Sequence, residues 1–133
     1  MKIVILLFFS LFSFSAFSQD REFTYKEGDV EFHMKSYYML IYLRGERSQE
    51  FSEEELAEIQ KAHLAHINEM AKEKVVLMAG PFEGDDDKRG ILVFDLATEE
   101  EVISYIEQDP SVQAGRLTYE IHKWWTEKGG CLD

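Results

Sequence analysis

The 133-residue sequence has one cysteine, two prolines and only 14 lysines and arginines, and these shortages exclude several classes of protein. Because Cys131 is the only cysteine, the chain can form neither an intrachain disulfide nor a structural zinc site of the cysteine type. The basic residues are outnumbered by 26 acidic ones, which gives a formal charge of −12. A chain this acidic is repelled by phosphate backbones, so we expect no nucleic-acid partner.

The sequence also lacks the motifs of several large enzyme classes. It contains no glycine-rich phosphate loop, no G-x-S-x-G elbow and no cysteine–histidine arrangement for nucleophilic catalysis. We therefore expect no cofactor and no covalent serine or cysteine mechanism.

The N-terminus carries the one long apolar run of the chain, from Ile3 to Phe17, after the basic residue Lys2. The run of about 15 residues suits a secretory signal better than a bilayer span, which needs roughly 20. Ala16 and Ser18 place small residues where a signal peptidase reads. We expect residues 1–18 to be a cleaved signal peptide, which makes the protein periplasmic or secreted, without stable membrane insertion after cleavage. The alternative is an uncleaved membrane anchor.

The rest of the chain is long enough for one domain with a core, since 45% of all residues are hydrophobic. Residues 19–36 are mixed and charged, with a turn signal at Gly28, and predict an irregular lead-in or an extra edge strand. Residues 37–126 hold the regular patterns and form the predicted domain. Residues 127–133 form a predicted flexible tail, where Cys131 has no assigned role.

The domain contains four apolar segments typical of strands and two helices that begin with capping boxes, at Ser52 and at Thr98. The first helix is predicted over 53–74. The second is predicted from 99 to a break before Pro110, because proline disfavours helical geometry in the preceding residue. The strands are predicted at 37–43, 75–79, 90–96 and 117–125.

The order of these elements, strand, helix, strand, strand, helix, strand, is that of a ferredoxin-like α+β fold. Such a fold has an antiparallel sheet with both helices on one face. The predicted strands carry large apolar side chains on both faces, so the face without helices needs an apolar cover. The simplest cover is the same face of a second subunit, which predicts a homodimer.

A histidine lies on the apolar face of the first predicted helix. At about 100° per residue, apolar side chains from Leu56 to Met70 gather on one side, and His63 falls near the middle of them. A buried imidazole needs a hydrogen-bond partner, because an unsatisfied polar group costs roughly 1–3 kcal/mol. The simplest partner is a backbone carbonyl. His66 one turn later could join His63 on a metal, but no third ligand lies nearby, so we expect no metal.

Three segments resemble the ordered motifs of the YciI-like, or YCII-related, proteins. They are Gln60-Lys61-Ala62-His63-Leu64-Ala65-His66, Ala79-Gly80-Pro81 and Asp109-Pro110-Ser111-Val112-Gln113-Ala114-Gly115. The resemblance covers about Tyr38 to Trp125 and implies a dimeric α+β barrel related in fold to muconolactone isomerases.

The resemblance also implies that His63 and Asp109 form the active-site pair. The sequence departs from many relatives in its expected signal peptide and in Ser111, which stands where an aromatic residue often follows the Asp-Pro pair. Ser111 could widen the pocket or alter the packing beside Asp109.

If the carboxylate of Asp109 meets one ring nitrogen of His63, the other nitrogen becomes a general base. Without a nucleophile or cofactor, the fitting reaction is isomerisation or elimination on a small lactone, enol or phenolic compound. The alternatives are a noncatalytic envelope module that binds a small ligand and a structural module in which the pair is only a core contact.

Further residues are assigned to substrate binding by hypothesis. Tyr38 or Tyr42 could polarise a substrate group, Arg44 could neutralise an anionic one, and Gly80-Pro81 could shape the pocket wall. The acidity of the whole chain favours neutral or singly charged organic molecules.

Overall fold

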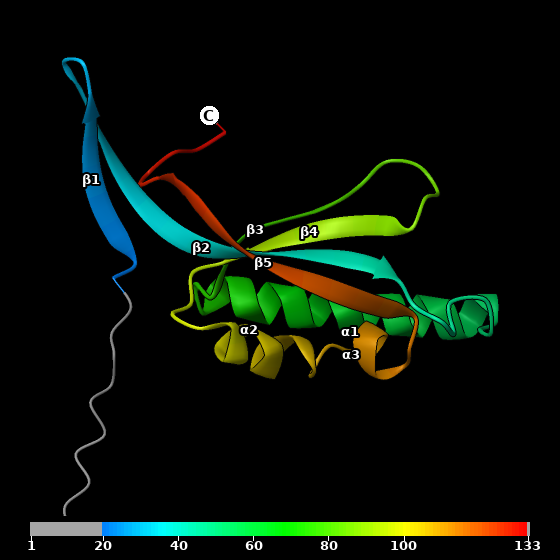
Figure 1. The fold of residues 1–133 in the computed structure, drawn as a ribbon. Helices are drawn as coiled ribbons and strands as arrows, with labels where there is room; N and C mark the ends of the chain where they lie inside the picture. The colour runs from blue at the N-terminus through cyan, green and yellow to red at the C-terminus, as the bar shows by residue number, and fades with distance from the viewer. Residues whose placement is uncertain (1–19, 133) are drawn as a thin grey trace, which may run out of the picture.

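The structure is a computed structural model that describes residues 20–132. The predicted signal peptide, residues 1–18, lies outside them. No helix within 20–132 is long and apolar enough to cross a membrane. Along the chain, as Figure 1 shows, the elements are β1 (Glu22–Glu27), β2 (Val30–Arg44), α1 (Glu53–Lys72), β3 (Val76–Pro81), β4 (Lys88–Phe94), α2 (Glu99–Ile106), α3 (Pro110–Gln113) and β5 (Leu117–Glu127).

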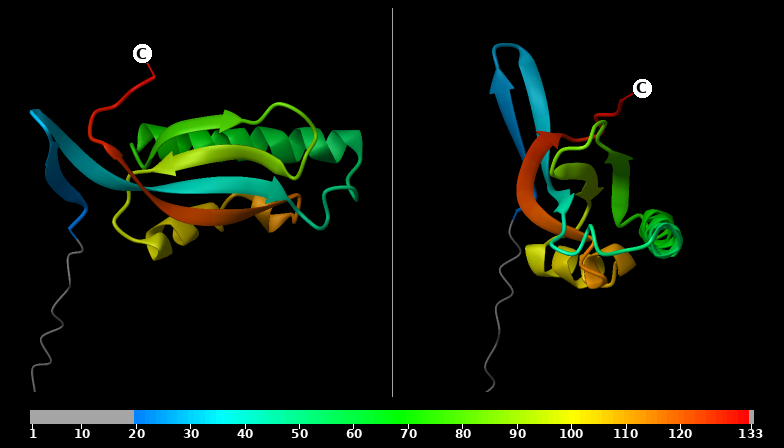
Figure 2. Two further views of the ribbon diagram at one scale, coloured as in Figure 1. Left: turned by 45° about the horizontal axis from the view of Figure 1, so that its top comes forward. Right: turned by 90° about the vertical axis from the view of Figure 1, so that its right-hand side faces the viewer.

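The sheet is antiparallel and is organised around the long strand β2. Strand β5 pairs with one edge of β2, while β4 pairs with the other edge and carries β3 beyond it. All three helices lie on one side of this sheet (Figure 1), and β5 curves around the core toward α3 (Figure 2). The predicted ferredoxin-like α+β fold is therefore confirmed, with the short α3 as an additional helix.

The lead-in is more regular than an irregular segment. Strand β1 pairs with the first part of β2, from Glu22 opposite Lys35 to Glu27 opposite Val30. Of the two interpretations of residues 19–36, the irregular one is wrong and the extra strand is right. The hairpin turns at Gly28, whose φ of +61° is a left-handed conformation that glycine adopts without strain. Phe23, Tyr25, Phe32 and Met34 alternate with polar or charged residues in the two strands, which is the pattern of a strand with one apolar face.

Both predicted capping boxes are present. Ser52 and Glu55 exchange the two capping hydrogen bonds at the start of α1, and Thr98 and Glu101 do the same at α2. Helix α1 ends at Lys72, two residues before the predicted end at Lys74. Lys74 has a φ of +59°, so the helix cannot continue through it.

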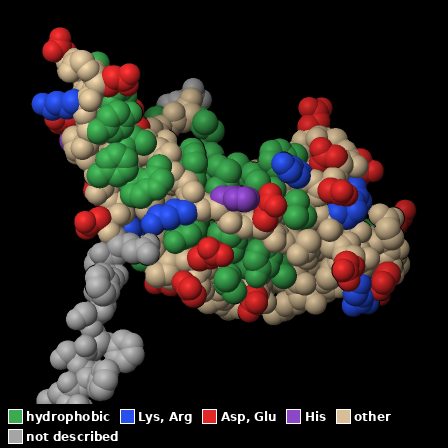
Figure 3. Space-filling model, viewed as in Figure 1, with side chains coloured by type: hydrophobic (Ala, Val, Ile, Leu, Met, Phe, Trp, Pro, Cys, Tyr) green, Lys and Arg blue, Asp and Glu red, His purple; other side chains and the backbone are tan. Residues whose placement is uncertain are grey.

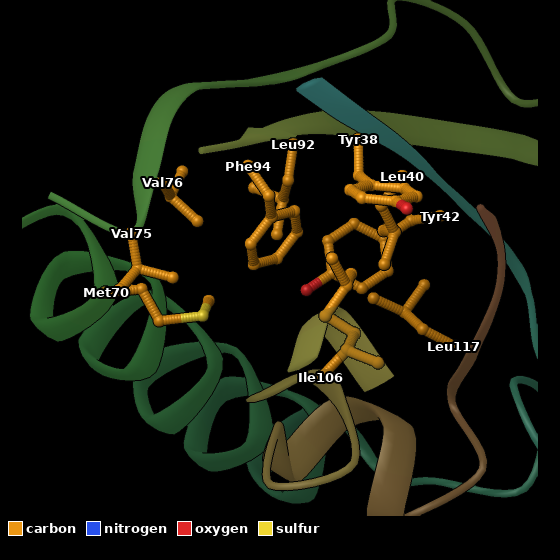
Figure 4. Close-up of a cluster of buried hydrophobic side chains, with 11 residues drawn as sticks. Tyr38, Leu40, Tyr42, Met70, Val75, Val76, Leu92, Phe94, Ile106 and Leu117 are labelled. Carbon is orange, nitrogen blue, oxygen red and sulfur yellow. The ribbon is translucent and has the colours of Figure 1, made fainter. Parts of the chain in front are cut away.

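The core fills the space between the sheet and the helices. Alternate residues of β2 from Ser36 to Tyr42 are buried, and those between them are half-buried. Burial of these side chains supplies the main driving force for folding. The buried apolar residues that pack together in this core, most of them labelled in Figure 4, are Tyr38, Leu40, Tyr42, Met70, Val75, Val76, Leu92, Phe94, Val102, Ile106 and Leu117.

The end of β2 and the start of β5 approach closely at Gly45. Its N–H donates to the carbonyl oxygen of Arg116 at 2.8 Å. An added Cβ at Gly45 would clash with the carbonyl oxygen of Gly115 and lie 2.7 Å from the carbonyl carbon of Arg116. Only a residue without a side chain permits this approach.

We expect Gly45→Ala to lower the free energy of unfolding by about 2 kcal/mol or more, because backbone atoms would have to separate. Urea denaturation followed by circular dichroism measures the change. Gly80→Ala is the matched control, since a Cβ there meets nothing within 4 Å. Equal stability of the two variants would show that the approach at Gly45 is not as close as described.

Candidate active site

The candidate site is built around the carboxylate of Asp109, which is fully buried. The residue lies where the chain leaves α2, and it caps α3 by accepting a hydrogen bond from the N–H of Ser111 at 2.8 Å. Pro110 occupies the first helical position, where its missing N–H costs nothing. The hydroxyl of Ser111 is buried without a partner among residues 20–132, and Ser111 does not line the cavity described below.

His63 from α1 meets this carboxylate. Its Nδ1 atom lies 2.9 Å from Oδ1 and 2.8 Å from Oδ2 of Asp109, and the residue is 7% exposed. The partner of the buried imidazole is therefore a carboxylate rather than the backbone carbonyl that the simplest interpretation of the sequence suggested. Helix α1 positions His63, and the corner between α2 and α3 positions its partner Asp109.

Tyr42 from β2 completes the arrangement. Its hydroxyl donates to Oδ2 of Asp109 at 2.6 Å, and its ring meets that of His63 edge-on, with centroids 5.3 Å apart. Burial and the nearby carboxylate of Asp109 raise the pKa of Tyr42 well above its usual value. The tyrosine therefore remains a hydrogen-bond donor over the physiological pH range.

The electrostatics favour an ionised Asp109. Burial alone raises the pKa of its carboxyl, but the hydrogen bonds from His63, Tyr42 and the N–H of Ser111 outweigh burial and leave the pKa below its usual value. An ionised carboxylate only accepts hydrogen bonds, so Nδ1 of His63 carries a proton. The other ring nitrogen, Nε2, has no hydrogen-bond partner within the described part of the chain.

A cavity of about 450 Å³ lies next to His63, between α1, the β3–β4 hairpin and the start of β5. This volume is within the range of small-molecule sites. Most of the wall is apolar, and Tyr42 and Asn68 add polar atoms. The apolar or glycine residues of the wall are Leu64, Ile67, Ala79, Gly80, Pro81, Gly90, Ile91, Leu92 and Leu117.

Two arginines and a glutamine that were not predicted from the sequence also line this cavity. Arg89 comes from β4, Arg116 directly precedes β5, and Gln60 lies one turn before His63 on α1. The Nη1 of Arg116 donates to Oε1 of Gln60. Only a weak sign in the sequence indicates that Arg116 belongs to the site, which is its position between Gly115 and the apolar start of the last predicted strand.

The structure brings together only part of the predicted set. Tyr42, Gly80 and Pro81 line the cavity with His63, whereas Tyr38 and Arg44 do not.

The two residues outside the cavity have other partners. The hydroxyl of Tyr38 lies at the N-terminus of α2, close to Glu99, and burial raises its pKa. Arg44 points into the β3–β4 loop, where its guanidinium contacts Asp85 at 2.7 Å and Asp87 at 3.7 Å. Tyr38, Tyr42 and Arg44 lie on the same strand, so their positions in the sequence could not show that only Tyr42 lines the cavity.

The two histidines of the H-x-x-H pair have different hydrogen-bond partners. His63 binds Asp109, while Nε2 of His66 donates to the carbonyl oxygen of Tyr105 at 2.9 Å and ties α1 to α2. In the part of the chain that the structure describes, no group of three His, Cys, Asp or Glu side chains could hold a metal ion.

The fold and this site agree with the family match of the sequence. The YCII-related domain matches residues 36–125, which is most of the chain, and the protein belongs to this family. The resemblance noted in the sequence is thereby confirmed. No functionally curated protein shows a significant match.

One similar solved structure is 5-chloro-2-hydroxyhydroquinone dehydrochlorinase from Burkholderia phenoliruptrix, in complex with 2,5-dihydroxybenzoquinone. It is 23% identical, with a TM-score of 0.50, and the match covers 65% of this chain and 92% of the other. The similarity supports the shared fold.

The lowered pKa of Asp109 predicts a specific pH dependence of stability. The unfolded state binds more protons than the native state just below pH 4, where a free aspartate has its pKa of about 3.9. The stabilisation by Asp109 is therefore complete above that pH and is lost as the pH falls through the lower, native pKa. We expect Asp109→Asn to cost about 3 kcal/mol at pH 7 and progressively less below pH 4.

Urea denaturation of both proteins between pH 7 and pH 2.5 measures this difference. Asp87→Asn is the control, because Asp87 lies on an exposed loop. A difference between wild type and Asp109→Asn that stays constant over this range would contradict an ionised, hydrogen-bonded Asp109.

Proposed function

We propose that the protein is a cofactor-independent enzyme that catalyses isomerisation or elimination on a small lactone, enol or phenolic compound. The observation that carries this proposal is the orientation of His63. One ring nitrogen is bound to the buried carboxylate of Asp109, and the ring itself borders a cavity of about 450 Å³. An imidazole held in this way is the usual form of a general base.

In the proposed reaction, Nε2 of His63 removes a proton from an acidic C–H or O–H group of the substrate. The bonding electrons stay on the substrate as an enolate or phenolate. In an elimination, these electrons form a double bond while a leaving group departs with its own bonding pair. In an isomerisation, the imidazolium returns the proton to a different substrate atom.

Asp109 acts as a positioning residue in this scheme. Its charge stabilises the imidazolium that forms after proton removal, and its contact with Nδ1 directs Nε2 away from the carboxylate. The hydroxyl of Tyr42 donates to Oδ2 of Asp109, and this hydrogen bond limits the movement of the carboxylate and of the imidazole bound to it. Removal of a proton therefore requires little rearrangement of the protein.

The similar solved structure supports the class of reaction and the size of substrate. It is named as a dehydrochlorinase and contains a dihydroxylated benzoquinone. A small ring compound of that kind suits the volume and the mostly apolar wall of the present cavity.

The apolar wall also supports the second candidate, a noncatalytic module that binds a small ligand. Proton exchange distinguishes the candidates without knowledge of the full reaction. We expect the protein to catalyse deuterium incorporation from D₂O into at least one member of a panel of unsaturated γ-lactones, 1,3-diketone enols and chlorinated hydroquinones. We expect His63→Gln to slow this exchange by at least about 100-fold, because general-base catalysis contributes that much.

His66→Gln is the matched control, since His66 lies on the same helix as His63 but binds the carbonyl oxygen of Tyr105 and does not line the cavity. One-dimensional NMR follows the exchange, and circular dichroism verifies that each variant is folded. Exchange unaffected by His63→Gln would contradict the proposal. Binding without exchange would favour the ligand-binding module, and loss of stability alone would favour the structural one.

We also propose that the protein is exported and works as a homodimer. The side chains of β2 that point away from the core, among them Tyr37, Met39 and Ile41, are only half-buried. Trp124 on β5 is 39% exposed and lies beside Tyr37 on this face. An apolar sheet face of this kind is suited to an identical face of a second subunit.

Sedimentation velocity tests the dimer. We expect the chain without residues 1–18 to sediment as a dimer and Met39→Glu to shift it toward monomer, because a carboxylate would be buried between the sheets. Gln113→Glu, on the exposed side of α3, adds the same charge and should leave the dimer intact. A monomeric wild type at 100 μM or equal effects of both substitutions would contradict this interface.

A further inference from the structure

Arg116 is unusual among the arginines of residues 20–132 because no carboxylate pairs with it. Each other arginine has an acidic partner, which is Asp95 for Arg21, Asp85 for Arg44 and Arg89, and Glu50 for Arg47. Within residues 20–132, the side-chain partner of Arg116 is the neutral amide of Gln60. The part of the chain that the structure describes is rich in acidic residues, yet it leaves this half-buried guanidinium without a carboxylate partner.

This guanidinium lies in an unfavourable environment. Burial and the nearby positive charge of Arg89 lower the pKa of Arg116, while Asp109 acts in the opposite direction. A partly desolvated cation next to a second cation loses hydration and gains repulsion. A negatively charged group placed between them would offset both effects.

The cavity contains the space for such a group. Arg89, Arg116 and His63 line the same cavity, and no aspartate or glutamate is among its lining residues. Arg89 uses Nη1 to contact oxygen atoms of Gly84, Asp85 and Asp86 in the β3–β4 loop at 3.2–3.4 Å. These contacts are long, and they orient Arg89 without neutralising the cavity.

From this geometry we propose that Arg116 and Arg89 form a subsite for a carboxylate group of the substrate, in the same cavity that His63 lines. The inference deepens the proposed function, since it names the class of molecule that the same cavity takes: a small, mostly apolar monocarboxylate. Guanidinium groups bind carboxylates through paired hydrogen bonds, which also fixes the orientation of the ligand. The apolar wall then holds the body of the molecule beside His63.

Binding of benzoate and of its neutral isostere benzamide tests this subsite without any turnover. The readout is the chemical-shift change of backbone amides that line the cavity, Gly80, Gly90 and Leu117, during NMR titration at pH 7. We expect benzoate to bind at least tenfold more tightly than benzamide, with an affinity that falls as salt increases.

Variants assign the preference to Arg116. We expect Arg116→Gln to weaken benzoate binding at least tenfold and to leave benzamide unchanged, and Arg116→Lys to retain part of the preference. Arg44→Gln is the matched control, because it removes the same charge from a neighbouring arginine that does not line the cavity. Circular dichroism verifies the fold of each variant, and Arg89→Gln gives a second test should Arg116→Gln not fold.

The outcomes separate this inference from the proposed function. Equal binding of benzoate and benzamide, or equal loss in Arg44→Gln and Arg116→Gln, would overturn the carboxylate subsite even if proton exchange depends on His63. Arg116-dependent binding of benzoate in a protein without proton exchange would support the subsite and overturn the enzyme.

Discussion

The buried carboxylate of Asp109 is the interaction on which the site depends. It receives hydrogen bonds from β2, α1 and α3, through Tyr42, His63 and the N–H of Ser111. A buried charge is stable only when such donors replace its lost hydration, so each donor must stay in place for the others to be effective. The carboxylate thereby joins the sheet, the long helix and the chain segment that leads into β5. The hydrogen bonds that stabilise this part of the fold are therefore the same ones that position His63.

The fold supplies the geometry that this carboxylate needs. Pro110 ends the helical path after α2 and turns Asp109 inward as the cap of α3. The pairing of β2 with β4 shifts register between Tyr42 and Leu43, next to the tyrosine that binds Asp109. Such irregularities re-aim side chains and are common beside functional sites. Gly90 then allows β3 to approach β4 closely, since a Cβ there would lie 2.7 Å from the carbonyl oxygen of Gly80.

Local sequence signals predicted the parts of this structure that depend on local interactions. Capping boxes located both helices, and helical periodicity located His63 because the core face of α1 is otherwise apolar. The strand character of residues 22–36 was visible as a short alternation, in which Phe23, Tyr25, Phe32 and Met34 are separated by polar or charged residues. Figure 3 shows hydrophobic side chains gathered on this arm. The alternation was outweighed by the high content of charged residues in the segment. Arg44 is opposite Leu117, the residue after Arg116, in the β2–β5 pairing, yet only Arg116 lines the cavity. The acidic β3–β4 loop binds Arg44 and keeps it out of the cavity, and this contact cannot be inferred from spacing along the chain.

The charge of the cavity differs in sign from the charge of the whole chain, and this difference matters most for the proposed function. A formal charge of −12 repels anions at long range, but solvent and salt screen that field within about 10 Å. Inside the cavity the lining charges are those of Arg89 and Arg116, and the carboxylate of Asp109 lies behind His63. In the proposed reaction, Asp109 orients the imidazole that accepts the proton, and the two guanidinium groups favour the electrons that remain on the substrate. The charges that line the cavity therefore affect the proposed proton transfer more directly than the acidity of the whole chain does.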